Sequence, residues 1–348
     1  MTEPINFPTV GSDSMSARYV QWLEQLAKNH AEQETPNADS VPFLSVLMRT
    51  QGKRYEPLKE ALLALEAQTD DDFEVILIMH RAKEEDKQTT YALVDALSPA
   101  FRKRVTVREL ETGTRSAPLN LALSLARGRY VTMLDDDDLV FEDWIENFHR
   151  GARKHDGRAI RCYAMTQFWQ SITDGHSNVW LQAMATPEPT YCEPFDMQKQ
   201  LWDNYTPISC MAIPRACHSV FGIAFDETLT TAEDWDFLMH CALLCGVYDT
   251  GEITFMYRLW QNGETSHTLH RNEEWLKNRE YILKRLHAIP YVTTAGGAWP
   301  IPEEGEELPQ MMPPLSFWQR LKRAVRKYGV LRFPFVVIRK VFDRLFGR

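Results

Sequence analysis

No stretch of this sequence is long and apolar enough to cross a membrane. The longest obvious apolar run, Phe333 to Ile338, is far shorter than the roughly 20 residues that a transmembrane helix needs. Residues 1–40 are polar and contain none of the apolar core of a secretory signal peptide. These absences lead us to expect a protein that is made and kept in the cytoplasm.

Cysteine is scarce, and its spacing excludes the common paired-cysteine sites. None of the six cysteines forms a C-x-x-C pair, so the sequence indicates neither a zinc finger nor a thioredoxin-type redox centre. Cys241 and Cys245 would share a helix face beside His240, which leaves a metal site as one interpretation. Buried, reduced thiols are the other, and a cytoplasmic protein usually has these.

Positive charge is in deficit everywhere except at the C-terminal end. Residues 316–348 hold ten Lys or Arg and one Asp, a net charge of +9. Because the whole chain has a net charge of −9, the remaining residues carry −18. Such an acidic body argues against nucleic acid as the main partner, and it directs the basic tail towards an anionic surface.

The hydrophobic pattern divides the chain into four parts. Residues 1–40 predict a short helix and a polar linker, and residues 276–315 predict a helix and an acidic linker with several prolines. Residues 316–348 form a basic amphipathic tail. Between them, residues 41–275 alternate short apolar runs with amphipathic segments. That alternation predicts an α/β domain whose mainly parallel sheet has helices on both faces.

The same pattern places the elements of this domain. Strands are expected at residues 43–48, 73–79, 104–109, 130–134, 159–169 and 209–213. Helices are expected from Pro57 onwards and at residues 89–97, 117–127 and 234–244.

Four consecutive aspartates, Asp135 to Asp138, come directly after one of these strands. In open α/β sheets, ligands bind outside the carboxyl ends of the strands. Paired carboxylates there suit a hard divalent cation, which can hold a diphosphate. If the extended conformation continues, Asp135 and Asp137 project to one side and Asp136 to the other. The alternative is a solvated acidic loop or helix N-terminus.

The segment from Gly128 to Asp138 resembles a signature block of a known family. Its sequence, Gly-Arg-Tyr-Val-Thr-Met-Leu-Asp-Asp-Asp-Asp, is similar to the G-x-Y-hydrophobic-x-x-L-D-x-D-D block of family 2 glycosyltransferases with the GT-A fold. Between Pro42 and His270, further segments resemble other motifs of that family in order. They are residues 45–50, 62–75, 120, 225–227, 231–236, 257–258 and 263–266.

The resemblance implies a fold and an activity. The fold is GT-A, with a Rossmann-like sheet, in which residues 41–138 bind the nucleotide sugar and residues 139–275 bind the acceptor. The activity is sugar transfer from a nucleoside-diphosphate donor with inversion at the anomeric carbon. With the basic tail, it leads us to expect a glycan or lipid-linked acceptor and a role in cell-surface polysaccharide assembly. The place of work would be the inner face of the cytoplasmic membrane.

The resemblance also assigns roles to residues. It makes Asp234 the base that takes the acceptor proton, with Glu233 beside it as an acceptor contact; a helix N-cap is the alternative role of this pair. It implies Mn²⁺ or Mg²⁺ held by Asp137 and Asp135. His267 is either a further ligand or an ordinary core or surface histidine. Our candidate donor-binding residues are Arg49, Thr50, His80, Arg115, Asn120, Asp135, Asp136 and Arg258. For Arg258, a structural ion pair is the alternative role.

Two departures from the family pattern concern the donor. Where the family has an acidic element that reads the nucleobase, this chain has Met79-His80-Arg81-Ala82, so His80 or Arg81 would contact the base or phosphate differently. Where the family has Ala-Arg-Asn, this chain has Pro118-Leu119-Asn120, and Arg115 is our candidate for the missing basic donor.

Other functions are compatible with parts of the sequence. A GT-A domain that binds nucleotide or glycan without turnover would explain the altered His80 region. A sugar nucleotidyltransferase shares the fold, but only Gly52-Lys53-Arg54 hints at its phosphate-binding loop. Indole rings stack on sugars, so one or two tryptophans of the acceptor half are candidate platforms, with core packing as the alternative. They are Trp169, Trp180, Trp202, Trp235 and Trp260.

The basic tail generates a first prediction. Its apolar side chains, such as Phe317 and Leu321, fall on one helical face with Lys and Arg around them, a pattern typical of helices that lie on anionic membranes. The full chain should float with anionic liposomes, whereas a chain ending at Pro314 should not. Equal flotation of the two proteins would show that the tail packs on the domain instead.

Overall fold

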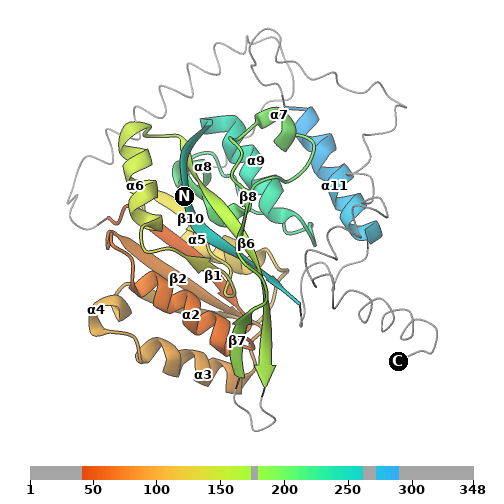
Figure 1. The fold of residues 1–348 in the computed structure, drawn as a ribbon. Coiled ribbons are helices and arrows are strands. Elements are labelled where there is room, and N and C mark those ends of the chain that lie inside the picture. Colours follow the sequence, from red (N-terminus) through yellow and green to blue (C-terminus); the bar gives the residue numbers. More distant parts are fainter. Residues whose placement is uncertain (1–40, 174–178, 262–271, 290–348) are drawn as a thin grey trace, which may run out of the picture. The chain divides into compact units, whose positions relative to one another are not determined.

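A sheet of ten strands forms the centre of the part of the chain described by the computed structural model (Figure 1). The structure describes residues 41–173, 179–261 and 272–289. All of them belong to a compact unit, Met1–Tyr291, and a second unit comprises Val292–Arg348. The expected N-terminal helix, the basic tail and His267 lie outside the described residues. No described helix has the length and hydropathy needed to span a membrane.

The elements follow the alternation expected from the sequence. The strands are β1 (Leu44–Thr50), β2 (Phe73–His80), β3 (Val105–Leu110), β4 (Tyr130–Met133), β5 (Leu139–Val140), β6 (Ala159–Thr173), β7 (Val179–Ala183), β8 (Glu188–Tyr191), β9 (Met211–Pro214) and β10 (Val247–Trp260). The helices are α2 (Tyr55–Glu66), α3 (Glu84–Asp95), α4 (Pro99–Arg102), α5 (Ala117–Leu125), α6 (Trp144–Lys154), α7 (Met197–Gln200), α8 (Ala216–Ser219), α9 (Glu233–Cys245) and α11 (Asn272–His287), with a 3-10 turn, η2, at Ile208–Cys210.

Strands β3, β2, β1 and β4 form the parallel part of the sheet, in that order. Leu44 of β1 pairs with Phe73 of β2 on one side and with Tyr130 of β4 on the other. The carboxyl ends of β1, β2 and β4 therefore lie at one edge, where open α/β sheets bind their ligands. The fold class expected from the sequence, a mainly parallel sheet flanked by helices, is confirmed.

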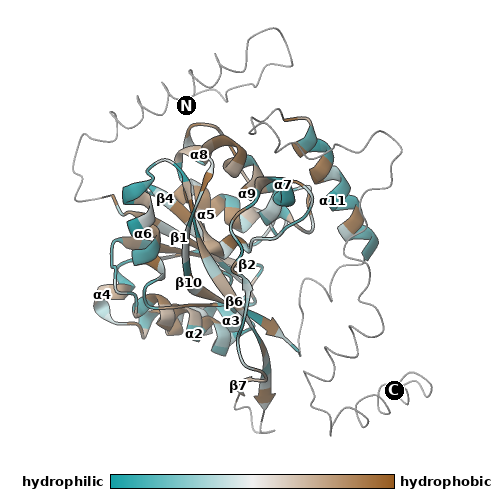
Figure 2. Cartoon of the chain, turned by 45° about the horizontal axis from the view of Figure 1, so that its top comes forward, coloured by the Kyte–Doolittle hydropathy of each residue, from teal (hydrophilic) through white to brown (hydrophobic). Residues whose placement is uncertain are grey.

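The two faces of β1 explain why its sequence is a continuous apolar run. Leu44, Val46 and Met48 pack with α2, α3 and α6, whereas Leu47 packs with α5 and α9 on the opposite face. A strand covered on both sides excludes water from both rows of side chains, so apolar residues are favoured in each. Helices α5 and α9 are accordingly coloured largely hydrophobic in Figure 2.

The second half of the sheet is mixed. β9 pairs antiparallel with β4 and β6, β10 runs parallel to β6 through two irregularities, and β7 and β8 pair antiparallel with β6. Here the expected strand at 209–213 is wrong at its start, because residues 208–210 form η2 and the extended chain begins at Met211. In the first half, α2 and α3 begin earlier than expected, at Tyr55 and Glu84.

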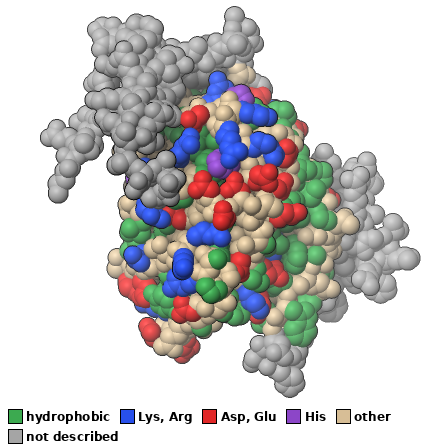
Figure 3. Space-filling model, turned by 90° about the vertical axis from the view of Figure 1, so that its left-hand side faces the viewer, with side chains coloured by type: hydrophobic (Ala, Val, Ile, Leu, Met, Phe, Trp, Pro, Cys, Tyr) green, Lys and Arg blue, Asp and Glu red, His purple; other side chains and the backbone are tan. Residues whose placement is uncertain are grey.

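Helix α11 belongs to the same packed body. Its Ile282, Leu283 and Leu286 form a third apolar cluster with Trp235 and Met239 of α9. The surface drawn in Figure 3 carries Lys, Arg, Asp and Glu side chains close together. Ion pairs such as Arg150–Glu252 and Arg129–Asp156 occur among the exposed residues of the described chain. This face has none of the one-signed basic character that nucleic-acid binding requires.

The start of β4 generates a prediction about stability. The Gly128 amide donates to Ser45 Oγ at 2.8 Å, and Ser45 Oγ donates to the buried Glu74. A Cβ on Gly128 would lie 2.6 Å from the Ser45 nitrogen, which is backbone and cannot move aside. We expect Gly128→Ala to lower the free energy of unfolding by about 2 kcal/mol, measured by chemical denaturation.

The matched control is Ser124→Ala, because that side chain is exposed on α5. It should change the denaturation midpoint by much less. Equal midpoints for Gly128→Ala and the native chain would mean that β1 and β4 separate easily at this point.

Candidate functional site

Three chain segments carry the candidate site at the carboxyl edge of the parallel strands. β1 ends with Arg49 and Thr50, the four aspartates follow β4, and α9 begins with Glu233 and Asp234. Arg115 lies just before α5. Side chains that are far apart in the sequence are thus joined by the parallel pairing of β1 and β4.

The aspartates form a turn rather than a continued strand. β4 ends at Met133, the Asp138 amide donates to the Asp135 carbonyl at 3.3 Å, and Thr50 Oγ1 donates to Asp136 at 2.6 Å. The expected alternation of Asp135 and Asp137 against Asp136 is therefore wrong. Arg54 instead pairs with both Asp136 and Asp137. Asp135 is left with 46% of its side chain exposed, against 16% for Asp137.

The turn carries more negative charge than its arginines offset. Burial raises the pKa of Asp137 to about 7; Arg54 opposes this rise, and Asp136 and Asp135 add to it. Burial also raises the pKa of Asp138, which is 2% exposed. Like-charged carboxylates that resist ionisation in this way favour any added cation.

Arg49 joins the aspartate turn to α9. Its Nη1 donates to Glu233 Oε1 at 3.0 Å and to the Arg115 carbonyl at 2.8 Å, while its Nε lies 3.7 Å from Asp135. Burial alone would lower the pKa of Arg49, but the charges of Glu233 and Asp135 outweigh it and raise that pKa. One guanidinium thus connects the aspartate turn with Glu233, the residue next to the candidate base.

Glu233 and Asp234 differ in their surroundings. Glu233 is 2% exposed and receives a second arginine, with Arg115 Nε at 2.9 Å. Asp234 is half-buried and accepts one hydrogen bond, from Asn204 at 3.4 Å. Burial and the charge of Glu233 raise the pKa of Asp234 to about 6, and Asp135 contributes to the rise.

The N-cap interpretation of this acidic pair is wrong. The residue that caps α9 is Ala232, whose backbone is left-handed, with φ 59° and ψ 22°, and which makes no side-chain cap bond. A left-handed conformation is unfavourable by about 1 kcal/mol for a residue other than glycine. Strain of this kind persists only where surrounding contacts enforce it.

Arg258 lies beside the aspartate turn with spare donors. Its amide donates to Asp138 Oδ1 at 2.8 Å, and its side chain pairs with Glu60 of α2. The guanidinium lies 4.6 Å from the ring centre of Trp169 and 5.7 Å from that of Trp260. Its Nε and Nη1 are buried without a hydrogen-bond partner. Buried N–H groups without partners are unfavourable, so this place suits an anionic ligand group.

The other expected donor residues lie at the end of β2 and on α5. His80 ends β2, is 7% exposed and has no partner at Nε2; burial lowers its pKa. Arg81 next to it has a positive φ of 53°. Asn120 of α5 bonds the segment before α9: its Oδ1 accepts from the Phe225 nitrogen, and its Nδ2 donates to the Phe225 carbonyl and to Glu227.

Sequence reasoning missed Arg54 and Asn204. Arg54 was considered only as part of a weak phosphate motif, although four adjacent acids after β4 demand a nearby cation and β1 is the neighbouring strand. No local signal identifies Asn204. Among the tryptophans, Trp235 is buried in the core at 1% exposure, Trp180 is 47% exposed, and Trp169 and Trp260 flank Arg258.

The residues of the turn fit a bound Mg²⁺ or Mn²⁺. Within the described ranges, no three His, Cys, Asp or Glu side chains converge as a complete ligand set. Mg²⁺, however, commonly takes one or two carboxylates and completes its shell with water and substrate phosphates. Asp135 and Asp137 offer hard oxygen donors, and the raised pKa of Asp137 marks the missing positive charge.

Comparison with known proteins agrees with the resemblance seen in the sequence. The model of the family described as Glycosyl transferase family 2 matches residues 45–213, just under half of the chain. An uncharacterized glycosyltransferase of Methanocaldococcus jannaschii is 20% identical over 200 residues, 58% of this chain and 64% of the relative. One of Rickettsia typhi is 23% identical over 246 residues, 70% of this chain and 73% of the relative.

Solved structures agree on the fold. The crystal structure of S. aureus TarS 1–349 in complex with UDP-GlcNAc superposes with a TM-score of 0.56 at 18% identity, covering 73% of this chain and 69% of that one. The UDP complex gives 0.53 at 18% identity, covering 73% and 68%. The resemblance to family 2 glycosyltransferases and the GT-A fold are thus confirmed. This chain spans just under two thirds of the length of the archaeal relative, and α9 and β10 lie beyond the family match.

The acidic turn generates a prediction about pH and cations. Because the folded pKa of Asp137 is about 7 and that of an unfolded aspartate is about 3.9, the unfolded chain loses its proton first. The contribution of Asp137 to stability therefore falls as the pH rises from about 4 to about 7, by a few kcal/mol. The melting temperature of Asp137→Asn minus that of the native chain should therefore be larger at pH 8 than at pH 5.

Added Mg²⁺ or Mn²⁺ should raise the melting temperature of the native chain at pH 8, because a ligand of the folded state stabilises it. Asp137→Asn should lose most of this increase. If both proteins respond equally to the cation, the turn does not hold it.

Proposed function

We propose that this chain, with its match to the family 2 glycosyltransferases, transfers a sugar from a nucleoside-diphosphate donor to an acceptor hydroxyl with inversion. The observation that supports this most is the Arg49 bridge. It contacts Asp135 after β4 and Glu233 at the start of α9, so one ion-pair network joins an acid proposed for the donor to the residue next to the proposed base, Asp234.

The donor side of the proposal rests on charge. Asp137 and Asp135 would hold Mg²⁺ or Mn²⁺, which stabilises the negative charge of the leaving nucleoside diphosphate when bound. Arg258 would donate its unpartnered Nε and Nη1 to phosphate oxygens. His80, whose Nε2 lacks a partner, would contact the nucleobase. Because TarS binds UDP-GlcNAc, that compound is the first donor to test.

On the acceptor side, Asp234 would accept the proton of the attacking hydroxyl. A pKa of about 6 makes Asp234 a stronger base than an ordinary aspartate, yet leaves it ionised at neutral pH. Glu233, held by Arg49 and Arg115, would orient the start of α9. Attack from the face opposite the leaving group inverts the anomeric carbon, and holding both partners in line supplies much of the rate.

The acceptor itself is inferred from the chain's composition. A glycan or a lipid-linked saccharide in cell-surface polysaccharide assembly remains our proposal, with the basic tail at an anionic membrane. Trp169 and Trp260 are engaged by Arg258, which leaves the exposed Trp180 as the freest candidate platform for a sugar ring.

One observation favours a second function, donor binding without turnover. Arg54 pairs with both Asp136 and Asp137, so it competes with a cation for the same carboxylates. If Arg54 stays in place when the donor binds, the domain would hold a nucleotide sugar without metal-assisted transfer.

The two functions differ in the effect of Asp234→Asn. As a transferase, the chain should lose about 10²- to 10⁴-fold in kcat, the usual contribution of a general base, while donor affinity is kept. The native rate should rise with pH through about 6 as Asp234 ionises, and the variant should lack this dependence. Donor consumption and product configuration are measured by NMR.

Asp95→Asn is the matched control, because Asp95 is exposed on α3 with 66% of its side chain accessible. It should turn over like the native chain. Unchanged turnover in Asp234→Asn would remove the base assignment. Tight donor binding by the native chain without any transfer would favour the binding domain.

A further inference from the structure

Helix α11 contacts the loop that leads into α9. This α9 entry loop, residues 226–232, ends at the strained Ala232 and delivers Glu233 and Asp234. Both α11 and the loop lie beyond the residues matched by the family model. Leu229 of the loop shares the third apolar cluster with Ile282, Leu283 and Leu286 of the helix. The helix also makes polar contacts with the loop, and these come from one face.

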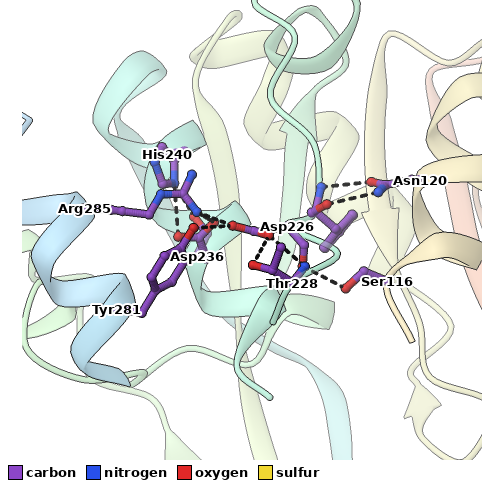
Figure 4. A network of polar contacts seen from close by, with 9 residues as sticks. Ser116, Asn120, Asp226, Thr228, Asp236, His240, Tyr281 and Arg285 are labelled. Carbon is purple, nitrogen blue, oxygen red and sulfur yellow. Dashed lines mark hydrogen bonds and ion pairs between the residues drawn. The ribbon is translucent and has the colours of Figure 1, made fainter. Parts of the chain in front are cut away.

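Arg285 and Asn278 make most of these contacts. Arg285 Nη1 donates to Asp226 at 2.7 Å and to Asp236 of α9 at 3.2 Å (Figure 4). Asn278 Nδ2 donates to the hydroxyls of Thr230 and Thr231, at 3.0 and 2.9 Å. The two residues thus bind both ends of the loop and the first turn of α9.

The loop is held on its other side by α5 and the residues before it. Ser116 Oγ donates to the Asp226 carbonyl at 3.3 Å, and Arg115 Nη1 donates to the Thr230 carbonyl at 3.2 Å. Figure 4 shows Ser116 and Arg285 approaching the loop from different elements. The loop therefore has two independent supports, and only that of α11 depends on side chains after residue 271.

The contacts of the loop maintain an unfavourable backbone conformation at Ala232. Its left-handed backbone is unfavourable for any residue except glycine, and no side-chain cap bond stabilises it. The residue before it, Thr231, is bound by Asn278, and the residue after it, Glu233, is bound by Arg49 and Arg115. Ala232 is thus held in its conformation by contacts on both sides.

We propose that Arg285 and Asn278 are positioning residues, which hold the α9 entry loop in its strained conformation so that Glu233 and Asp234 meet Arg49 and Asp135. This proposal rests on the proposed function for its effect on turnover. The apolar cluster that Ile282, Leu283 and Leu286 form with Leu229 of the loop and Trp235 and Met239 of α9 docks α11 without Arg285. Loss of the Arg285 charge therefore changes the loop without removing the helix.

The test uses Arg285→Met in the full chain, with Lys284→Met as the matched control. Lys284 is an exposed cation on the same helix. Arg285→Met should lower kcat about 10-fold, since small misplacement of a catalytic group costs up to about 10²-fold, while the donor KM stays within about twofold. Asn278→Ala should act in the same direction, and Lys284→Met should match the native chain.

Ala232→Gly provides the rescue. Glycine adopts the left-handed conformation without strain, so the loop no longer needs α11 to enforce it. Added to Arg285→Met, and compared with Ala232→Gly alone, it should restore most of kcat. An unchanged kcat in Arg285→Met, or a loss that Ala232→Gly does not reverse, would overturn the proposal.

A readout without turnover separates this proposal from the proposed function. Amide hydrogen exchange across residues 226–234 should be faster in Arg285→Met than in Lys284→Met, and slower again with Ala232→Gly. If the native chain transfers no sugar but exchange follows this pattern, the proposed function fails and the support by α11 stands. If exchange is the same in Arg285→Met and Lys284→Met, the support by α11 fails.

Discussion

Charge compensation at the carboxyl edge of the parallel strands is the constraint on which the rest of this structure depends. The aspartate turn and the acids of α9 are partly withdrawn from water, and buried carboxylates are tolerated only when they are paired or protonated. The arginines that pair with them come from separate segments. Arg49 and Arg54 flank the end of β1, and Arg115 precedes α5. Arg258, near the end of β10, donates its backbone amide to Asp138, while its side chain pairs with Glu60. The pairing of β1 with β4 and the packing of α9 against the sheet bring these charges within reach of each other.

The pairing of these charges is incomplete, and the unpaired groups indicate which ligands the site could bind. Asp137 keeps a pKa near 7 although Arg54 binds it, and Arg258 keeps unpartnered donors a short way along the same edge. The aspartate turn at Asp137 therefore lacks positive charge, and Arg258 lacks an anionic partner for its free donors. A cation and a diphosphate together would supply both, and neither alone would do so. This complementarity accounts for a turn of four acids at a place where a folded chain would otherwise avoid them.

The parallel strands were predictable because burial on both faces demands continuous apolar runs, as in residues 43–48 and 73–79. The aspartates were predictable as a site because they follow such a strand. The residue that pairs with each charge was not predictable, because the hydrophobic pattern indicates which residues are buried and not which residues pair over long distances. The assumption that the strand continued gave the wrong alternation at Asp136, because the chain turns after Met133. The hydrogen bonds of Asn120 to Phe225 could not be read from the sequence either. Nothing in the local sequence marks Ala232 as left-handed, because tertiary contacts impose that conformation.

The same reasoning explains why Asp234 is the best candidate base of the three acids in the first turn of α9. Glu233 and Asp236 are buried at 2% and 1% exposure, and each is paired with arginine, Glu233 with Arg49 and Arg115 and Asp236 with Arg285. Arginine hydrogen bonds occupy oxygens of these two carboxylates, which leaves them less able to contact an acceptor hydroxyl. Within the described residues Asp234 makes no ion pair, and the hydrogen bond that it accepts from the Asn204 side chain is long at 3.4 Å. Its partly exposed side chain can reach an incoming hydroxyl. The arginines thus leave one acid of the turn free to exchange a proton.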